Sequence, residues 1–215
     1  MILYAVPLSS YCAKVRFCLA LKGQVAELRV PPGGYRSAAY RQIVPAGTIP
    51  AIVDGDFTLA ESDTILEYLE DRYPEPRLLP EDIRARARAR YLGRLHDLHL
   101  EPRVRALFAL VGVRQPDEAE TAAVRQRLDL VERHLDPAGP FAAGPQLSLA
   151  DCAFPATFAI IDAFAELFGW PPVWGARSGR WREAIEAHPA FASILGEYRS
   201  TVATWIADKL RGPAG

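Results

Sequence analysis

The sequence changes its pattern near residue 80, and this change limits the folds that the chain can adopt. Before that point, short apolar runs are interrupted by proline and glycine. From Ile83 onward, apolar residues recur three and four positions apart, and no segment alternates like a strand. The stretch between is rich in proline, which disfavours a helix. The sequence therefore predicts an α/β domain over residues 1–77 and an all-helical domain over residues 83–215, with a linker at about residues 74–82.

The first domain is expected to run strand, helix, strand, then a loop, then two strands and a helix. The expected strands are 2–6, 27–30, 49–53 and 57–59, and the expected helices are 13–21 and 64–72. Gly23 is placed to end the first helix. Asp54-Gly55-Asp56 is a tight-turn signal that predicts a hairpin between the last two strands.

The second domain is expected to be helical throughout. Helical spacing predicts helices over 91–111, 124–135, 150–168 and 191–205. Pro102 predicts a bend in the first of these. Ser148 and Asp151 have the spacing of a capping box, and the segment that they open is apolar on almost every face. That helix is therefore expected to be central and buried.

Composition excludes several classes of protein. The net charge is −1, so no global field attracts nucleic acid or an anionic membrane. Arg84, Arg86, Arg88 and Arg90 are two apart, which spreads them around a helix instead of forming a stripe. Three cysteines are an odd number, and a disulfide framework is not expected. The apolar start is interpreted as a strand and not a signal peptide, and no apolar stretch reaches membrane-spanning length. We expect a soluble, cytoplasmic protein.

Three short segments of the first domain are candidates for a binding site. Ser9 and Ser10 lie where a strand gives way to a helix; a serine hydroxyl there can donate to a thiolate, or it can simply cap the helix. Pro50, directly before a strand, is a candidate cis-proline, with an ordinary trans turn as the alternative. Glu61 and Ser62 open a helix, where the serine suits an N-cap and the glutamate can meet an ammonium group.

In this order and spacing, these segments resemble the glutathione S-transferase family, over essentially the whole chain. Ser9-x-x-Cys-x-x-Val-Arg16 is similar to the serine-type theta and zeta classes, and Pro45-x-Gly-x-Ile-Pro50 looks like the family's cis-proline segment. Leu59-x-Glu-Ser-x-x-Ile65 is similar to its γ-glutamyl-binding turn. Gly144-x-x-x-Ser-x-Ala-Asp151 matches the capping box of its central helix.

The resemblance implies a thioredoxin-like βαβ-ββα domain followed by a helical bundle. It also implies a glutathione S-transferase that activates the glutathione thiol for attack on a small hydrophobic electrophile. Glutathione is the co-substrate, no metal is expected, and a homodimer is implied. The implied catalytic residue is Ser9, with Ser10 as the alternative. The glutathione-binding residues are Ser9, Thr48, Ile49, Pro50, Glu61 and Ser62. The implied pocket for the electrophile is lined by Leu8, Tyr11, His99, Leu107, Phe108 and Trp205.

Other interpretations stay open at this stage. The chain can be a non-catalytic module that binds glutathione, because a fold does not determine an activity. It can also be a glutathione-dependent isomerase similar to maleylacetoacetate isomerase. Cys12 is expected to be a buried core thiol, with a reactive thiol at the helix start as the alternative. His96 and His99 have helical spacing but no clear third partner, which argues against a metal site.

Overall fold

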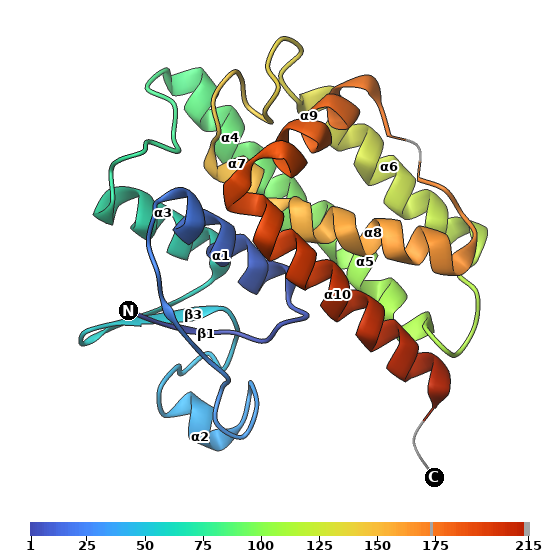
Figure 1. Cartoon of the computed structure of the whole chain (residues 1–215), viewed down its shortest axis with the longest axis horizontal. Coiled ribbons are helices and arrows are strands. Elements are labelled where there is room, and N and C mark those ends of the chain that lie inside the picture. The colour runs from blue at the N-terminus through green and yellow to red at the C-terminus, as the bar shows by residue number, and fades with distance from the viewer. Residues whose placement is uncertain (173, 213–215) are drawn as a thin grey trace. The chain divides into compact units, whose positions relative to one another are not determined.

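The computed structural model describes residues 1–172 and 174–212. The chain divides into two compact units, residues 1–78 and residues 79–215 (Figure 1). The first unit contains a four-stranded sheet, and the second consists of helices joined by loops. This confirms the predicted combination of a thioredoxin-like domain and an all-helical domain.

The sheet of the first unit has the strand order β2-β1-β3-β4. Its strands are β1 (Ile2–Tyr4), β2 (Glu27–Arg29), β3 (Ala51–Asp54) and β4 (Phe57–Ala60). β1 is parallel to β2 and antiparallel to β3, and β3 is antiparallel to β4. Asp54 pairs with Phe57, so the loop between them has two residues, and Gly55 adopts φ 67° there. The antiparallel pairing of β3 with β4 confirms the predicted hairpin. Its turn needs a residue that tolerates positive φ, which Gly55 supplies.

Three helices accompany the sheet: α1 (Ser10–Leu21), α2 (Ala38–Arg41) and α3 (Ser62–Arg72). Figure 1 shows α1 and α3 on one side of the sheet and α2 on the other. The segment between the second and third strands was expected to be a loop, but it contains α2. Ser37 caps α2 by accepting the backbone N–H of Tyr40 at 3.0 Å. A helix this short has too few residues for a periodic apolar pattern, which is why the sequence did not indicate it.

The second unit contains seven α-helices within its described residues. They are α4 (Ile83–Leu95), α5 (Glu101–Ala106), α6 (Glu118–His134), α7 (Leu149–Ala153), α8 (Pro155–Phe168), α9 (Ala176–Ala187) and α10 (Pro189–Arg211). A π-helical turn, His96–Leu100, joins α4 to α5, and a 3₁₀ turn, Leu107–Leu110, follows α5. The segment expected as one helix bent at Pro102 is therefore four shorter pieces, and α9 was not expected at all.

The predicted central helix is buried but interrupted. Ser148 and Asp151 form the expected capping box at the start of α7. Helix α7 ends at Ala153, and α8 begins again at Pro155. Proline lacks the N–H that a continuous helix needs and is tolerated only in a first turn, which explains the break. Most of the first ten residues of α8 are buried. The expectation of one unbroken helix over 150–168 was wrong at this point.

Among the helices that the structure describes, none has the length and hydropathy to cross a membrane.

Candidate functional site

The register of the sheet brings the three predicted segments of the first unit to one end. Ala51 starts β3 and pairs with Tyr4 on one side and with Ala60 on the other. The chain therefore leaves β1 toward Ser9, enters β3 from Pro50, and leaves β4 toward Glu61, and all three strand ends lie at the same end of the sheet. Residues that are far apart in the sequence thus have their backbones at one end of the unit.

Ser9 is the N-cap of α1. Its backbone is extended, with φ −79° and ψ 116°, and its Oγ accepts the backbone N–H of Cys12 at 3.2 Å. A hydroxyl that accepts one hydrogen bond keeps its own O–H for donation. Ser9 can therefore cap the helix and donate to an anion at the same time. Ser10 is fully buried, whereas Ser9 keeps 8% of its surface exposed, so the two serines differ in access.

The neighbours of Ser9 have different environments. Cys12 is 1% exposed, as expected of a core thiol. Leu8 and Tyr11 are half-buried. These two residues are the part of the implied electrophile pocket that lies in the first unit.

The segment before β3 has the predicted backbone geometry. The Ile49–Pro50 peptide bond is cis, which confirms the expectation at Pro50. Tyr40 donates its phenolic O–H to the carbonyl oxygen of Thr48 at 3.0 Å. Burial, together with the neighbouring Cys12 and Tyr4, raises the pKa of Tyr40 well above its ordinary value, so this donor stays protonated. Thr48 Oγ1 is buried and has no hydrogen-bond partner among the described residues.

Glu61 and Ser62 form a strained start to α3. Glu61 is the N-cap, with φ 70° and ψ 114°, and its side chain makes no capping hydrogen bond. Ser62 is the first helical residue, so the expectation of Ser62 at the N-cap was wrong by one position. A residue with a Cβ at positive φ costs about 1–3 kcal/mol, and such strain is concentrated at functional sites. In this strained turn Glu61 is exposed, whereas Ser62 is buried, with 6% of its surface exposed.

The remaining implied pocket residues lie in the helical unit. Phe108 packs against Phe164 and Trp205, with ring centroids 5.0 and 4.8 Å apart. Leu107 is 2% exposed and belongs to the core, while His99 is exposed. Phe108 and Trp205 therefore form one aromatic cluster with Phe164, which the sequence did not single out. The sequence indicated Phe164 only as one of many apolar residues in an expected core helix, and the structure buries it fully.

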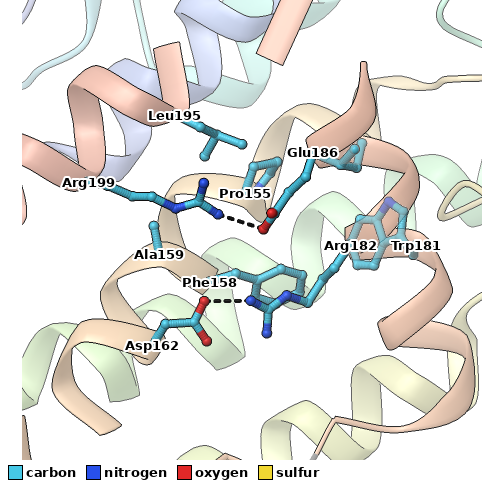
Figure 2. Close-up of a pocket in the computed structure, with 10 residues that line it drawn as sticks. Pro155, Phe158, Ala159, Asp162, Trp181, Arg182, Glu186, Leu195 and Arg199 are labelled. Carbon is cyan, nitrogen blue, oxygen red and sulfur yellow. Dashed lines mark hydrogen bonds and ion pairs between the residues drawn. The ribbon is translucent and has the colours of Figure 1, made fainter. Parts of the chain in front are cut away.

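A separate pocket lies between α8, α9 and α10, and Figure 2 shows its lining. Two ion pairs cross it, Arg182 with Asp162 and Arg199 with Glu186. The guanidinium of Arg182 also lies 3.9 Å above the ring of Trp174. Burial raises the pKa of Asp162 above its ordinary value, against the opposing charge of Arg182. The residues expected to hold the electrophile do not line this pocket.

The two histidines that were considered as metal ligands are in different environments. His96 is fully buried, with Nε2 2.7 Å from Oγ1 of Thr157 and Nδ1 2.6 Å from Oδ1 of Asp97. His99 is exposed. Within the described ranges, no three His, Cys, Asp or Glu residues are grouped as metal ligands.

Two residues beside the candidate site, Lys14 and Asp63, were not predicted from the sequence. Lys14 is fully buried in α1 and forms an ion pair with Asp63 in the first turn of α3. A signal was available, because Ser10, Lys14 and Cys18 share one face of the helix at four-residue spacing. A lysine in the middle of a helix face that otherwise carries small, uncharged residues indicates a buried charge that needs a partner.

Comparison with known proteins gives a consistent result. Residues 3–77 match the family described as "Glutathione S-transferase, N-terminal domain". A probable maleylacetoacetate isomerase of Vibrio cholerae is 33% identical over 213 residues, covering 92% of this chain and 96% of that protein. Human glutathione S-transferase theta-2B is 35% identical over 180 residues, covering 76% of this chain and 74% of the relative.

A solved structure is also similar. The maleylacetoacetate isomerase of Methylobacterium extorquens, whose structure contains bound malonate and GSH, superposes with a TM-score of 0.70. It is 28% identical, and the match covers 93% of this chain and 97% of the other. The likeness thus extends over both units, each of which has a counterpart in the relatives.

Proposed function

The chain belongs to the glutathione S-transferase family, and we propose that it is a glutathione transferase whose Ser9 hydroxyl stabilises the glutathione thiolate. The observation that carries the proposal is the position of Ser9, which caps α1 and keeps an O–H to donate. The nearby N-terminus of α1 adds positive potential, because its first backbone N–H groups point toward the same place.

The energy required of this arrangement is modest. A free thiol has a pKa of about 8.5, so only a few per cent is ionised at neutral pH. Lowering that pKa by about two units needs roughly 2.7 kcal/mol of additional thiolate stabilisation. One hydroxyl hydrogen bond to a charged sulfur and a helix N-terminus together supply energy of that order. The proton leaves to solvent, and the thiolate sulfur bonds to a carbon of the electrophile, which either releases its leaving group to solvent or, on addition, gives up a π bond.

The other residues of the site hold the peptide. Ile49, at the cis-proline, presents its backbone to the cysteinyl part of glutathione. Ser62 receives the γ-glutamyl carboxylate at the start of α3, and Glu61 faces the γ-glutamyl ammonium. The unpartnered Thr48 hydroxyl supports a polar ligand at this edge, because a buried polar atom without a partner is costly.

The electrophile is proposed to contact the cluster of Phe108, Phe164 and Trp205. Aromatic rings supply apolar area, and Phe108 and Trp205 are not fully buried. Such a surface binds a small hydrophobic molecule without acid–base groups.

Calorimetric titration with glutathione, followed by a conjugation assay with chlorodinitrobenzene and a panel of other electrophiles, tests this function. We expect binding of glutathione and conjugation of at least one electrophile. Binding without turnover on every member of the panel points to the non-catalytic module.

A second activity has specific support from the similarity to maleylacetoacetate isomerases over nearly the full chain. The same thiolate can add reversibly to a conjugated double bond, allow rotation about the resulting single bond, and leave again. Isomerisation returns glutathione unchanged, whereas conjugation consumes it. A cis-to-trans assay with maleylacetoacetate under conditions where free thiol is monitored separates the two reactions.

We also propose that the protein is a homodimer, as the family resemblance implies and as is commonest for soluble oligomers. Light scattering at micromolar concentration should give twice the chain mass, and a monomer mass contradicts the proposal.

A further inference from the structure

Two buried ion pairs connect α1 and α3 within the first unit. Lys14 pairs with Asp63, and their side chains are 0% and 18% exposed. Lys22, the C-cap of α1, pairs with Glu70, and these side chains are 0% and 8% exposed. Both lysines come from α1 and both carboxylates from α3, and the two helices contact each other.

The spacing of the pairs fixes the relative direction of the two helices. Eight residues separate the lysines and seven separate the acids, which correspond to about 12 and 10.5 Å along a helix axis. The helices therefore run in the same direction, side by side on one side of the sheet (Figure 1). As a result their N-termini, with Ser9 at one and Ser62 at the other, lie at the same end.

Of the two pairs, Lys14–Asp63 lies at this functional end. Asp63 directly follows Ser62, and Lys14 is one turn beyond Ser10 on the same face of α1. The pair therefore joins the first turn of α3 to the helix that Ser9 caps. The Glu61 backbone at φ 70° immediately precedes this first turn, so an attachment is located where the chain is strained.

Stability alone gives little reason for a charge pair in this position. A buried ion pair is often no more stabilising than apolar side chains of the same size, because both charges lose their hydration. A buried lysine that loses its ion-pair partner costs folding free energy, however, and this cost favours structures in which Asp63 stays close to Lys14. The pair thus restricts where the first turn of α3 can lie more strongly than apolar contacts do.

We propose that Lys14 and Asp63 are positioning residues, which hold Ser62 at the γ-glutamyl end of glutathione at a fixed distance from Ser9 at the sulfur. This inference rests on the proposed function. Neither residue contacts the ligand in this proposal; both act through the backbone of the α3 first turn. Loss of the pair should therefore weaken binding of glutathione and leave the ionisation of its thiol unchanged.

The test is the double variant Lys14→Met/Asp63→Asn, which removes both charges and keeps the side-chain shapes. We expect the dissociation constant and the KM for glutathione to rise by roughly tenfold, with kcat at saturating glutathione within about twofold of wild type. The pKa of bound glutathione, measured by thiolate absorbance, should not move. γ-Glutamylcysteine, which keeps the γ-glutamyl group, should lose affinity by the same factor.

The matched control is Lys22→Met/Glu70→Gln, which removes a pair of similar burial between the same two helices, at their other ends. The Gln oxygen can still accept the Leu78 backbone N–H that Glu70 binds at 3.0 Å. This control should lower the thermal midpoint about as much as the test variant and leave glutathione affinity at the wild-type value. A second test variant, Lys14→Arg, keeps the charge and should retain most of the affinity.

Each outcome decides the question. Wild-type affinity in Lys14→Met/Asp63→Asn overturns the inference while the proposed function stands. Equal loss of affinity in test and control variants also overturns it, since the effect then follows from general destabilisation. If Lys14→Met/Asp63→Asn does not fold, the single variant Asp63→Asn decides: weaker glutathione binding with an unchanged thiol pKa supports positioning by this pair, and wild-type affinity overturns it. Absence of glutathione binding in the wild type overturns both the proposed function and this inference.

Discussion

The indole N–H of Trp181 donates a 2.7 Å hydrogen bond to Oδ1 of Asp151, thirty residues earlier in the chain. The same carboxylate accepts the backbone N–H of Ala142, the backbone N–H of Ser148 and the hydroxyl of Ser148, at 2.7 to 2.9 Å. Burial raises the pKa of Asp151 above its ordinary value, and these four donors oppose the rise by favouring the carboxylate. Asp151 therefore connects the start of α7 to α9 and to the loop that precedes α7.

From this arrangement we predict that Asp151→Ala destabilises the protein far more than Trp181→Phe. The alanine variant leaves three buried N–H groups without an acceptor and should lose roughly 3–5 kcal/mol of unfolding free energy. Trp181→Phe removes one donor and part of the ring, and should lose about 1–3 kcal/mol. Urea unfolding measures both, and similar losses would mean that the carboxylate is not the centre of the network.

A second prediction concerns Ser9. Ser9→Ala should raise the pKa of bound glutathione toward its free value and lower turnover near neutral pH, while glutathione affinity changes little. The same change removes a helix cap and should lower stability by about 1 kcal/mol. Ser9→Gly separates the two effects, because glycine keeps most of the capping but has no hydroxyl.

Ser10→Ala is the matched control for the catalytic assignment. It should keep the thiol pKa and the rate, because Ser10 is fully buried. A wild-type thiol pKa in Ser9→Gly, with a raised one in Ser10→Ala, assigns the hydroxyl to Ser10 instead.

Glu61 offers a prediction in which stability and binding change in opposite directions. Glycine adopts positive φ without the Cβ penalty, so Glu61→Gly should raise the free energy of unfolding by about 1 kcal/mol. It also removes the carboxylate proposed to meet the γ-glutamyl ammonium, and glutathione should bind roughly ten- to a hundredfold more weakly. Denaturant unfolding and calorimetry on the same preparation test both parts. Unchanged affinity would mean that the turn is only structural.

The last prediction concerns Glu132, whose carboxylate accepts the backbone N–H groups of Arg177 and Ser178 at 2.9 and 2.8 Å. Partial burial opposes its charge, but these hydrogen bonds outweigh burial and hold the pKa of Glu132 below its ordinary value. The unfolded chain then binds the proton more tightly, so the stabilisation is present above about pH 4.3 and disappears as the pH falls through the folded value.

Glu132→Gln should therefore cost about 1 kcal/mol of stability at pH 7 and much less near pH 3. Unfolding curves at the two pH values measure the difference, and a loss that is independent of pH contradicts the assignment. Gly175→Ala provides a steric check, because a Cβ there lies 2.2 Å from Cδ of Glu132 and should disturb the same contact at every pH.

Features whose interacting partners lie within about four residues of each other could be predicted from the sequence alone. Ser9 caps α1 through Cys12, Gly55 makes the β3–β4 turn, and Ser148 and Asp151 form their capping box. These contacts depend on local backbone geometry, which residue type and spacing constrain directly. The same local patterns carried the family resemblance and, with it, the cis bond before Pro50.

Features whose interacting partners are distant in the chain could not be predicted and became visible in the folded unit. The start of α9 is fixed by Glu132 of α6, 45 residues before Arg177, and the α9 segment itself buries few residues, so its pattern did not indicate a helix. Asp63 forms its ion pair with Lys14, 49 residues away. Spacing along the chain carries no information on such pairs, because the fold that brings them together is set by the packing of the whole unit.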